Sequence, residues 1–259
     1  MKIVIFTSNL LRHKFFANSL SEIVDDALII SECRKSDNID LKDNSSSIDE
    51  HFKLRSNVEQ KFFSGNDFFS GKVLPLLYKE VNLQSTFETV KKFQPDLMLV
   101  FGSSIIREPF ISLLKPGRFI NLHLGLSPYY RGSGTNFWPF VNNELEYVGS
   151  TILHLDSGID TGDIVCHVLP KIKLGDNVHT VGCKVIEESV KKLSKIISFI
   201  DQGNELPRIK QWKIPNEKYY KNNDFNEKIL LKYKENLQNG LIEKFLQSDR
   251  NNPKICLFE

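Results

Sequence analysis

The stretch TFETVKKFQPDLMLVFGSS, residues 86–104, decides the fold class that the sequence predicts. Its first part has the apolar spacing of an amphipathic helix, Pro95 marks where that helix must end, and a fully apolar strand follows. A strand that is apolar at every position is typical of a parallel sheet, because helices then cover both of its faces. The stretch therefore indicates a helix that leads into a buried, parallel strand.

The same alternation of strands and helices continues toward both ends of the chain. In the first half, the other expected elements are the strands KIVIF (2–6), DALIISE (26–32) and FINLHL (119–124), a helix capped by Asn9, and a polar helix near His51–Phe63 within loops of residues 42–71. In the second half, they are strands in antiparallel pairing at Gly149–Leu155 and Asp163–Lys173, one helix within Asp176–Ile200, and tail helices at Asn226–Lys234 and Gly240–Gln247.

This order of elements predicts an α/β fold with a Rossmann-like, mostly parallel sheet, an antiparallel addition and a short helical C-terminal extension. A TIM barrel would need eight strand–helix units, and the chain shows too few. The composition changes near Leu206, where the chain becomes rich in Lys, Asn and Tyr. We therefore place the boundary between a large domain, residues 1–205, and the extension, residues 206–259.

Composition limits the classes of protein to which the chain can belong. Of 259 residues, 41% are hydrophobic and 25% are charged, which is ordinary for a globular protein. The 34 Lys and Arg residues against 32 Asp and Glu residues give a net charge of +2, too small to indicate a nucleic-acid or membrane surface. The N-terminus resembles neither a signal peptide nor a membrane span, and the four cysteines lack the spacing of a zinc site. We expect a cytoplasmic protein that needs no metal ion.

Two polar side chains lie where one of the expected strands ends. Asn121 and His123 are two residues apart, so an extended chain points both from the same face. Ligands of open parallel sheets bind at the carboxyl ends of strands, and an amide and an imidazole could there face one reacting centre. The alternative is that Asn121 bonds to neighbouring backbone and that His123 is a core histidine.

The segment HLDSGIDTGDIV, residues 154–165, is the second candidate element. Segments of Asp and Gly usually form turns, since Gly adopts positive φ and Asp bonds to its own backbone. The chain lacks the motifs that bind dinucleotides or nucleoside triphosphates, so both kinds of chemistry are disfavoured. The five other histidines show no spacing of metal ligands.

Taken together, these motifs resemble those of the folate-dependent formyltransferases, and the likeness extends from about Pro95 to Ile200. The residues that carry it are Asn-x-His at 121–123, Pro128, the pair Arg131–Gly132 and Leu-Asp-x-Gly-x-Asp-x-Gly at 155–162. One departure is that the chain reads Gly-Leu-Ser-Pro at 125–128, where transfer-RNA and purine enzymes of this family read Ser-Leu-Leu-Pro. The resemblance implies transfer of a formyl group from N10-formyltetrahydrofolate to a primary amine.

The resemblance also implies which residues form the site. The expected catalytic residues are Asn121, His123 and Asp160; the expected folate contacts are Ser104, Ile105, Arg107 and Asp156. The chemistry suits these residue types, because imidazoles titrate near neutral pH and can accept the proton of an attacking amine. The amide can donate to the developing oxyanion, and the carboxylate can orient the imidazole.

The remaining question is which amine accepts the formyl group. Residues 206–259 hold eleven Lys and Arg against seven Asp and Glu. This excess is more typical of a solvated helical face than of a surface that binds transfer RNA. The stretch YYRGSGTNFWPFVNN, residues 129–143, resembles the amino-sugar N-formyltransferases of surface-polysaccharide (lipopolysaccharide O-antigen) synthesis. We therefore expect a nucleotide-linked amino sugar as partner, with Arg131, Asn136 and Trp138 at its entry, although Arg131 could instead only pin the loop.

Several alternatives remain open at this stage. The chain could formylate methionyl-tRNA or glycinamide ribonucleotide, release formate as a formyltetrahydrofolate hydrolase, or only bind a folate or nucleotide. The predicted tail helices carry apolar positions that could also pair two subunits in a homodimer.

Overall fold

A computed structural model of the chain describes residues 1–34, 46–215, 217–248 and 252–258. Within these residues, seven strands form one sheet in the order β3-β2-β1-β4-β5-β7-β8. The strands are β1 (Lys2–Ser8), β2 (Asp26–Cys33), β3 (Lys72–Leu77), β4 (Leu97–Val100), β5 (Phe119–His123), β7 (Ser150–His154) and β8 (Ile164–Val168). A small second sheet pairs β6 (Tyr130–Gly132) with β9 (Lys218–Tyr220) in parallel.

The pairing of the strands confirms the predicted α/β fold. The pairs formed among β1 to β5 are parallel, whereas β7 pairs with β5 and β8 with β7 in antiparallel register. The antiparallel addition therefore lies beside β5, the strand that ends in Asn121 and His123. In the register, Asn121 stands opposite Val100 of β4 on one side and opposite Leu153 of β7 on the other.

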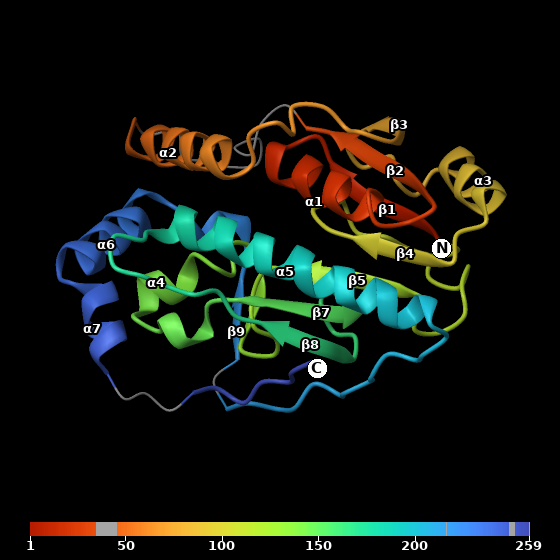
Figure 1. Ribbon diagram of the computed structural model, residues 1–259. Coiled ribbons are helices and arrows are strands. Elements are labelled where there is room, and N and C mark those ends of the chain that lie inside the picture. Colours follow the sequence, from red (N-terminus) through yellow and green to blue (C-terminus); the bar gives the residue numbers. More distant parts are fainter. Residues whose placement is uncertain (35–45, 216, 249–251, 259) are drawn as a thin grey trace.

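Helices cover both faces of the sheet, and α1 and α5 lie across the face turned to the viewer in Figure 1. The helices are α1 (Leu11–Ser21), α2 (Ser46–Phe62), α3 (Gln84–Phe93), α4 (Trp138–Asn142), α5 (Val178–Asp201), α6 (Glu227–Gln238) and α7 (Leu241–Gln247). Two short 3-10 turns cover Leu145–Tyr147 and Asn222–Asp224.

The alternation of side chains along β1 explains why helices are needed on both faces. Ile3 and Ile5 pack in the hydrophobic cluster beneath α1 and α5, whereas Val4 and Phe6 pack in the cluster that contains Val90 of α3. All four β1 side chains are fully buried. Burying a side chain of this size contributes roughly 1.5–3 kcal/mol, so an all-apolar strand is stable only between two layers of helix.

The N-terminal half differs from the sequence analysis at two points. Asn9 does not cap the first helix: the N-cap residue is Leu10, which makes no side-chain bond, while the Asn9 amide exchanges hydrogen bonds with the backbone of Arg34. The sequence also gave no sign of β3, because this edge strand contains Pro75 and is largely exposed. The expected polar helix is present as α2, and residues 42–45 of the expected loop lie outside the described residues.

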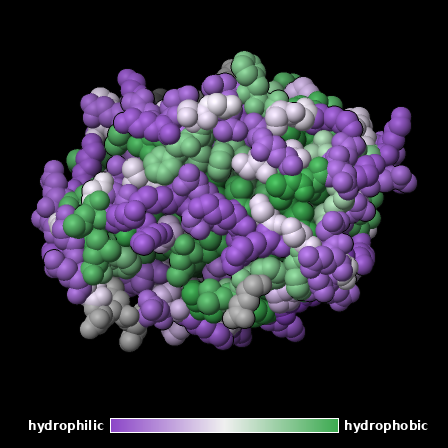
Figure 2. Space-filling view, viewed as in Figure 1, coloured by the Kyte–Doolittle hydropathy of each residue, from purple (hydrophilic) through white to green (hydrophobic). Residues whose placement is uncertain are grey.

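The C-terminal extension packs against the large domain. Leu230 and Tyr233 of α6 and Leu241 and Ile242 of α7 are buried in one hydrophobic cluster with α4 and the start of α5. In the orientation of Figure 1, polar residues predominate on the surface, and apolar patches show between them (Figure 2). The division of the chain at residues 205 and 206 stays a prediction, and so does the homodimer.

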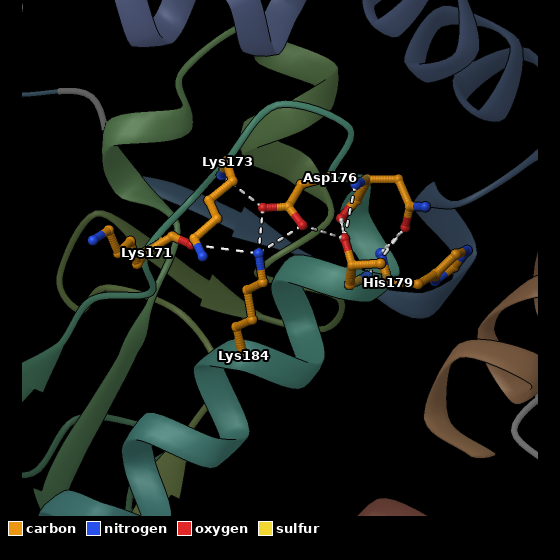
Figure 3. Close-up of polar contacts among 7 residues, drawn as sticks. Lys171, Lys173, Asp176, His179 and Lys184 are labelled. Atoms are coloured by element: carbon orange, nitrogen blue, oxygen red, sulfur yellow. Dashed lines mark hydrogen bonds and ion pairs between the residues drawn. The ribbon is translucent and has the colours of Figure 1, made fainter. Parts of the chain in front are cut away.

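Helix α5 begins with a network of polar contacts that fixes its first turn (Figure 3). The Asn177 side chain accepts hydrogen bonds from the backbone N–H groups of His179, at 2.9 Å, and Thr180, at 3.1 Å. The Thr180 hydroxyl in turn accepts from the backbone N–H of Asn177 at 2.9 Å, which completes a capping box. Beside this turn, the Asp176 carboxylate accepts a hydrogen bond from the Lys184 ammonium at 2.6 Å. The backbone position of His179 is therefore firmly set.

We predict that Asn177→Ala lowers the free energy of unfolding by about 1 kcal/mol, because two N–H groups at the start of α5 lose their acceptor. Chemical denaturation monitored by circular dichroism measures this change. Ser198→Ala, at an exposed position near the end of the same helix, is the control and should change the unfolding free energy by less than about 0.5 kcal/mol. Equal effects of the two substitutions would contradict the capping role.

Candidate active site

The three residues expected to be catalytic come together in the structure. The Asn121 amide Nδ2 donates to Oδ1 of Asp160 at 3.2 Å, and Nδ1 of His123 lies 3.3 Å from Oδ2 of the same carboxylate. The first two residues stand at the end of β5 and the third in the loop that joins β7 to β8. Because β7 runs antiparallel to β5, its last residue, His154, stands opposite Ile120 near the start of β5. The loop that follows β7 therefore starts beside the amino end of β5, and it brings Asp160 to the Asn121 and His123 side chains.

The loop of residues 156–163 has a backbone that needs local support. Asp160 is a non-glycine residue with φ of +53°, a left-handed conformation that Asp adopts more readily than most residues. The Asp156 carboxylate closes the loop by accepting from the Thr161 hydroxyl at 2.9 Å and from the backbone N–H of Gly158 at 3.0 Å. Gly162 packs so closely that an added Cβ would lie 1.8 Å from the His154 carbonyl oxygen. The sequence signal of Asp and Gly in this loop is thus explained by turn geometry as well as by chemistry.

The imidazole of His123 lies between two oxygen atoms. The ring is 7% exposed, and its Nε2 lies 3.2 Å from the carbonyl oxygen of Tyr130, opposite the contact of Nδ1 with Asp160. An imidazolium can donate to both oxygens, whereas a neutral ring has a single N–H. The pocket can therefore accommodate the cation that forms when the ring takes up a proton.

A cavity of about 1000 Å³ opens in front of these residues. Asn121, His123 and Asp160 line it, and so do Ser104, Ile105 and Arg107, three of the four expected folate contacts. The Ser104 turn is held by Glu32, whose buried carboxylate accepts from the Ser104 backbone N–H at 2.6 Å. The Ser104 hydroxyl is buried without a hydrogen-bond partner among the described residues, which leaves it available to a ligand in the cavity.

The expected acceptor contacts differ in their surroundings. Asn136 and Trp138 line the cavity; the Asn136 oxygen accepts from the Gly149 N–H at 3.0 Å, while its Nδ2 is buried and has no partner within the described part of the chain. Arg131 instead pairs with Glu217 and is not among the described residues that line the cavity. Asp156 is also absent from this lining, and its carboxylate stays within its own loop. The binding roles of all four expected folate and three expected acceptor residues stay predictions.

Two buried histidines in the cavity wall were not expected to belong to the site. His51 of α2 and His179 of α5 stand with ring centroids 4.4 Å apart and are 8% and 6% exposed. Burial, aided by the positive charge of Arg55, lowers the pKa of His51 to about 4, and burial together with the neighbouring His51 lowers the pKa of His179 to about 3. Both rings are therefore neutral at physiological pH. They lie 128 residues apart in the chain, so no local pattern reveals the pair.

Two more contributors to the site gave no sequence signal. Glu32 stands near the end of β2, where its charge was not assigned a role, although it holds the turn before Ile105. Gln211 of the extension donates to two carbonyl oxygens of the loop that carries Asp160. Neither residue is close in sequence to the groups that it contacts.

Neither a membrane-crossing helix nor a cluster of metal-binding side chains is present in the described part of the chain. None of the helices in residues 1–34, 46–215, 217–248 and 252–258 combines the length and the apolar character that a membrane crossing requires. The same ranges contain no group of three or more His, Cys, Asp or Glu side chains placed to hold a metal ion.

Comparison with known proteins gives a family and several relatives. The family model described as formyl transferase matches residues 1–197. A methionyl-tRNA formyltransferase of Desulforamulus reducens is 33% identical over 147 residues, which are 54% of this chain and 46% of that protein. A GDP-perosamine N-formyltransferase of Brucella melitensis is 29% identical over 124 residues, which are 48% of this chain and 47% of that protein. The matched region thus spans less than half the length of these two relatives.

Two solved structures share the fold. A phosphoribosylglycinamide formyltransferase of Anaplasma phagocytophilum matches with a TM-score of 0.58 at 15% identity, covering 85% of this chain and 98% of that one. An N-formyltransferase of Helicobacter canadensis, solved with folinic acid and dTDP-3-aminofucose, matches with a TM-score of 0.54 at 19% identity, covering 87% and 72% of the two chains. At these identities, the matches establish the common fold.

We predict that stability falls as the pH is lowered from 7 to 5, because the two cavity histidines have lower pKa values folded than unfolded. Below about pH 6.5 the unfolded chain takes up a proton on each ring, whereas the folded chain does so only near pH 4 at His51 and near pH 3 at His179. Each ring should cost on the order of 1–2 kcal/mol of unfolding free energy over this range.

Denaturant titrations at pH 7, 6 and 5, where most carboxylates remain ionised, measure the loss. The variant His51→Phe keeps an aromatic ring but cannot be protonated, so the difference between pH 7 and pH 5 should shrink by roughly 1–2 kcal/mol. An unchanged pH dependence in this variant would show that His51 is not neutral in the folded protein.

Proposed function

Because the chain belongs to the formyl transferase family, we propose that it transfers the formyl group of N10-formyltetrahydrofolate to the primary amine of a nucleotide-linked amino sugar. The observation that carries this proposal is the convergence of Asn121, His123 and Asp160 at the wall of one large cavity. Such an arrangement offers an oxyanion donor, a proton acceptor and a carboxylate that orients the acceptor.

The chemistry of each residue follows from its contacts. N10-formyltetrahydrofolate supplies the formyl group. The Asn121 amide donates to the formyl oxygen as negative charge develops there, a contribution typically of about 3–4 kcal/mol. His123 takes a proton from the amine nitrogen as that nitrogen bonds to the formyl carbon, and returns it to N10 as the bond from carbon to N10 breaks. Asp160 holds His123 in place and stabilises its protonated form.

The cavity suits the folate on the side of Ser104. The unpartnered Ser104 hydroxyl and the half-exposed side chain of Ile105 supply a polar and an apolar contact. The side chains of Arg34, Lys79 and Arg107 also line the cavity and give this part positive charge. Cationic side chains can pair with the carboxylates of a folate or with the phosphates of a nucleotide.

Support for an amino-sugar acceptor comes from the other part of the cavity. Its wall is aromatic and includes the rings of His51, Phe52, Phe137, Trp138 and Phe225. The volume, about 1000 Å³, lies at the upper end of the usual range for small-molecule sites, which fits two sizeable ligands. The Brucella relative acts, by its name, on GDP-perosamine, and the Helicobacter structure contains dTDP-3-aminofucose.

Methionyl-tRNA is the second candidate acceptor, because the Desulforamulus enzyme is the more similar of the two relatives, at 33% identity. The near-balance of charge, +2 over the whole chain, argues against it, since transfer RNA is usually held by a strongly basic surface. The two acceptors differ in size and chemistry, so one assay separates them.

We predict formyl transfer from N10-formyltetrahydrofolate, followed by the absorbance of the folate product, with one member of a panel of dTDP-, UDP- and GDP-linked amino sugars. His123→Asn should lower kcat roughly 10²- to 10⁴-fold by removing the proton acceptor, and Asn121→Ala roughly 10²- to 10³-fold by removing the oxyanion donor. Asn204→Ala, an exposed substitution beyond α5, is the matched control and should leave kcat within twofold.

If the protein formylates methionyl-tRNA or glycinamide ribonucleotide but none of the sugars, the proposed acceptor is wrong. The proposed reaction, formyl transfer from the folate, would still hold. Formate release in the absence of any amine would instead identify a formyltetrahydrofolate hydrolase. A protein that binds folate but transfers no formyl group to any of these acceptors, and whose His123→Asn variant binds folate as the parent does, would be a binding protein.

A further inference from the structure

The segment that follows α5, residues 206–212, runs beside the loop that carries Asp160, and we call it the strap. After α5 the chain turns back and passes along the β8 side of the sheet (Figure 1). Ile209 and Ile164, the first residue of β8, exchange backbone hydrogen bonds of 3.0 and 2.7 Å. The Leu206 side chain is buried in the core, and the Pro207 carbonyl lies 2.9 Å from Nε2 of His154. The strap is thus anchored at both strands that flank the loop.

This anchoring brings one side chain onto the backbone of the loop. The Gln211 amide Nε2 donates to the carbonyl oxygen of Asp160 at 2.7 Å and to that of Gly162 at 2.9 Å. The two carbonyls therefore share a single amide group, whose two hydrogens can serve one oxygen each. The distance along the chain between Gln211 and Asp160 is 51 residues, so the contact exists only because the strap is docked.

Gln211 and the other site residues contact different parts of Asp160. Asn121 and His123 contact the carboxylate, at 3.2 and 3.3 Å, whereas Gln211 holds the carbonyl of the same residue. The backbone of Asp160 has φ of +53°, which costs more for a non-glycine residue than for glycine and persists only where surrounding contacts stabilise it. Gln211 donates one hydrogen bond to the carbonyl of this residue and a second to the Gly162 carbonyl of the same loop.

We propose that Gln211 is a positioning residue, whose amide fixes the backbone of Asp160 so that the carboxylate stays in contact with His123 and Asn121. The inference rests on the proposed function, in which Asp160 orients His123. It assigns to the C-terminal extension a part in the reaction that does not require any contact of the extension with substrate. A shift of about 1 Å in such a group can lower a rate by about 10²-fold.

The test compares variants at Gln211 in the full-length protein. Gln211→Met keeps a similar length but has no donor, and we expect kcat to fall ten- to hundredfold, with the KM for the acceptor changed less than threefold. Gln211→Lys restores a donor of similar reach and should recover at least part of the lost kcat. Arg208→Gln is the matched control: it removes the ion pair of the same strap with Asp163, at 3.3 Å, and should leave kcat within twofold because the Arg208 side chain is about half exposed to solvent.

Hydrogen exchange of the amides in residues 156–163, followed by mass spectrometry, gives a readout that needs no reaction. Exchange there should be faster in Gln211→Met than in the parent and unchanged in Arg208→Gln. If the parent transfers formyl groups but Gln211→Met keeps the parental kcat, or if Gln211→Lys recovers nothing, the positioning role is refuted and the proposed function stands. If the parent shows no transfer, the proposed function fails, and the exchange rates alone decide whether Gln211 holds the loop.

Discussion

The candidate site depends on one carboxylate that contacts both an amide and an imidazole. The Asp160 oxygens lie 3.2 Å from the Asn121 nitrogen and 3.3 Å from His123 Nδ1, so each of the three groups limits where the other two can lie. Strand geometry supplies two of them, because residues two apart on β5 share a face. The third lies in the loop between β7 and β8, which starts beside the amino end of β5 and extends to the Asn121 and His123 side chains. The antiparallel addition is thus the feature that completes the site on an otherwise parallel sheet.

The C-terminal extension also helps to hold the three site residues in place. Its strap holds the Asp160 loop through Gln211, and its strand β9 pairs with β6, the strand that begins with Tyr130. The Tyr130 carbonyl is the oxygen next to Nε2 of His123. The Tyr220 ring stacks on Trp138 at a centroid distance of 3.9 Å, which fixes a side chain of the cavity wall. The extension therefore supports the site on two sides.

Local sequence patterns were enough to predict most of the elements in order and the shared face of Asn121 and His123, because strand and helix periodicities are short. Long-range contacts carry no such pattern. Gln211 is 51 residues from the carbonyl that it binds, and the ring contact of His51 with His179 joins two helices from different parts of the chain. Asn9 had the sequence signal of a helix cap, but a competing contact with the Arg34 backbone uses its amide. Such competition is decided by tertiary structure, which a single sequence does not display.

In the proposed formyl transfer, the Asp160 carboxylate acts through His123. The most direct test is a single-turnover measurement of formyl transfer by Asp160→Asn, with the acceptor identified for the parent, together with the affinity of both proteins for tetrahydrofolate by fluorescence. The account predicts a rate at least about 10²-fold lower in the variant with folate affinity close to that of the parent, because the amide preserves the shape of the loop but not its charge. Transfer by Asp160→Asn at the parental rate would contradict it.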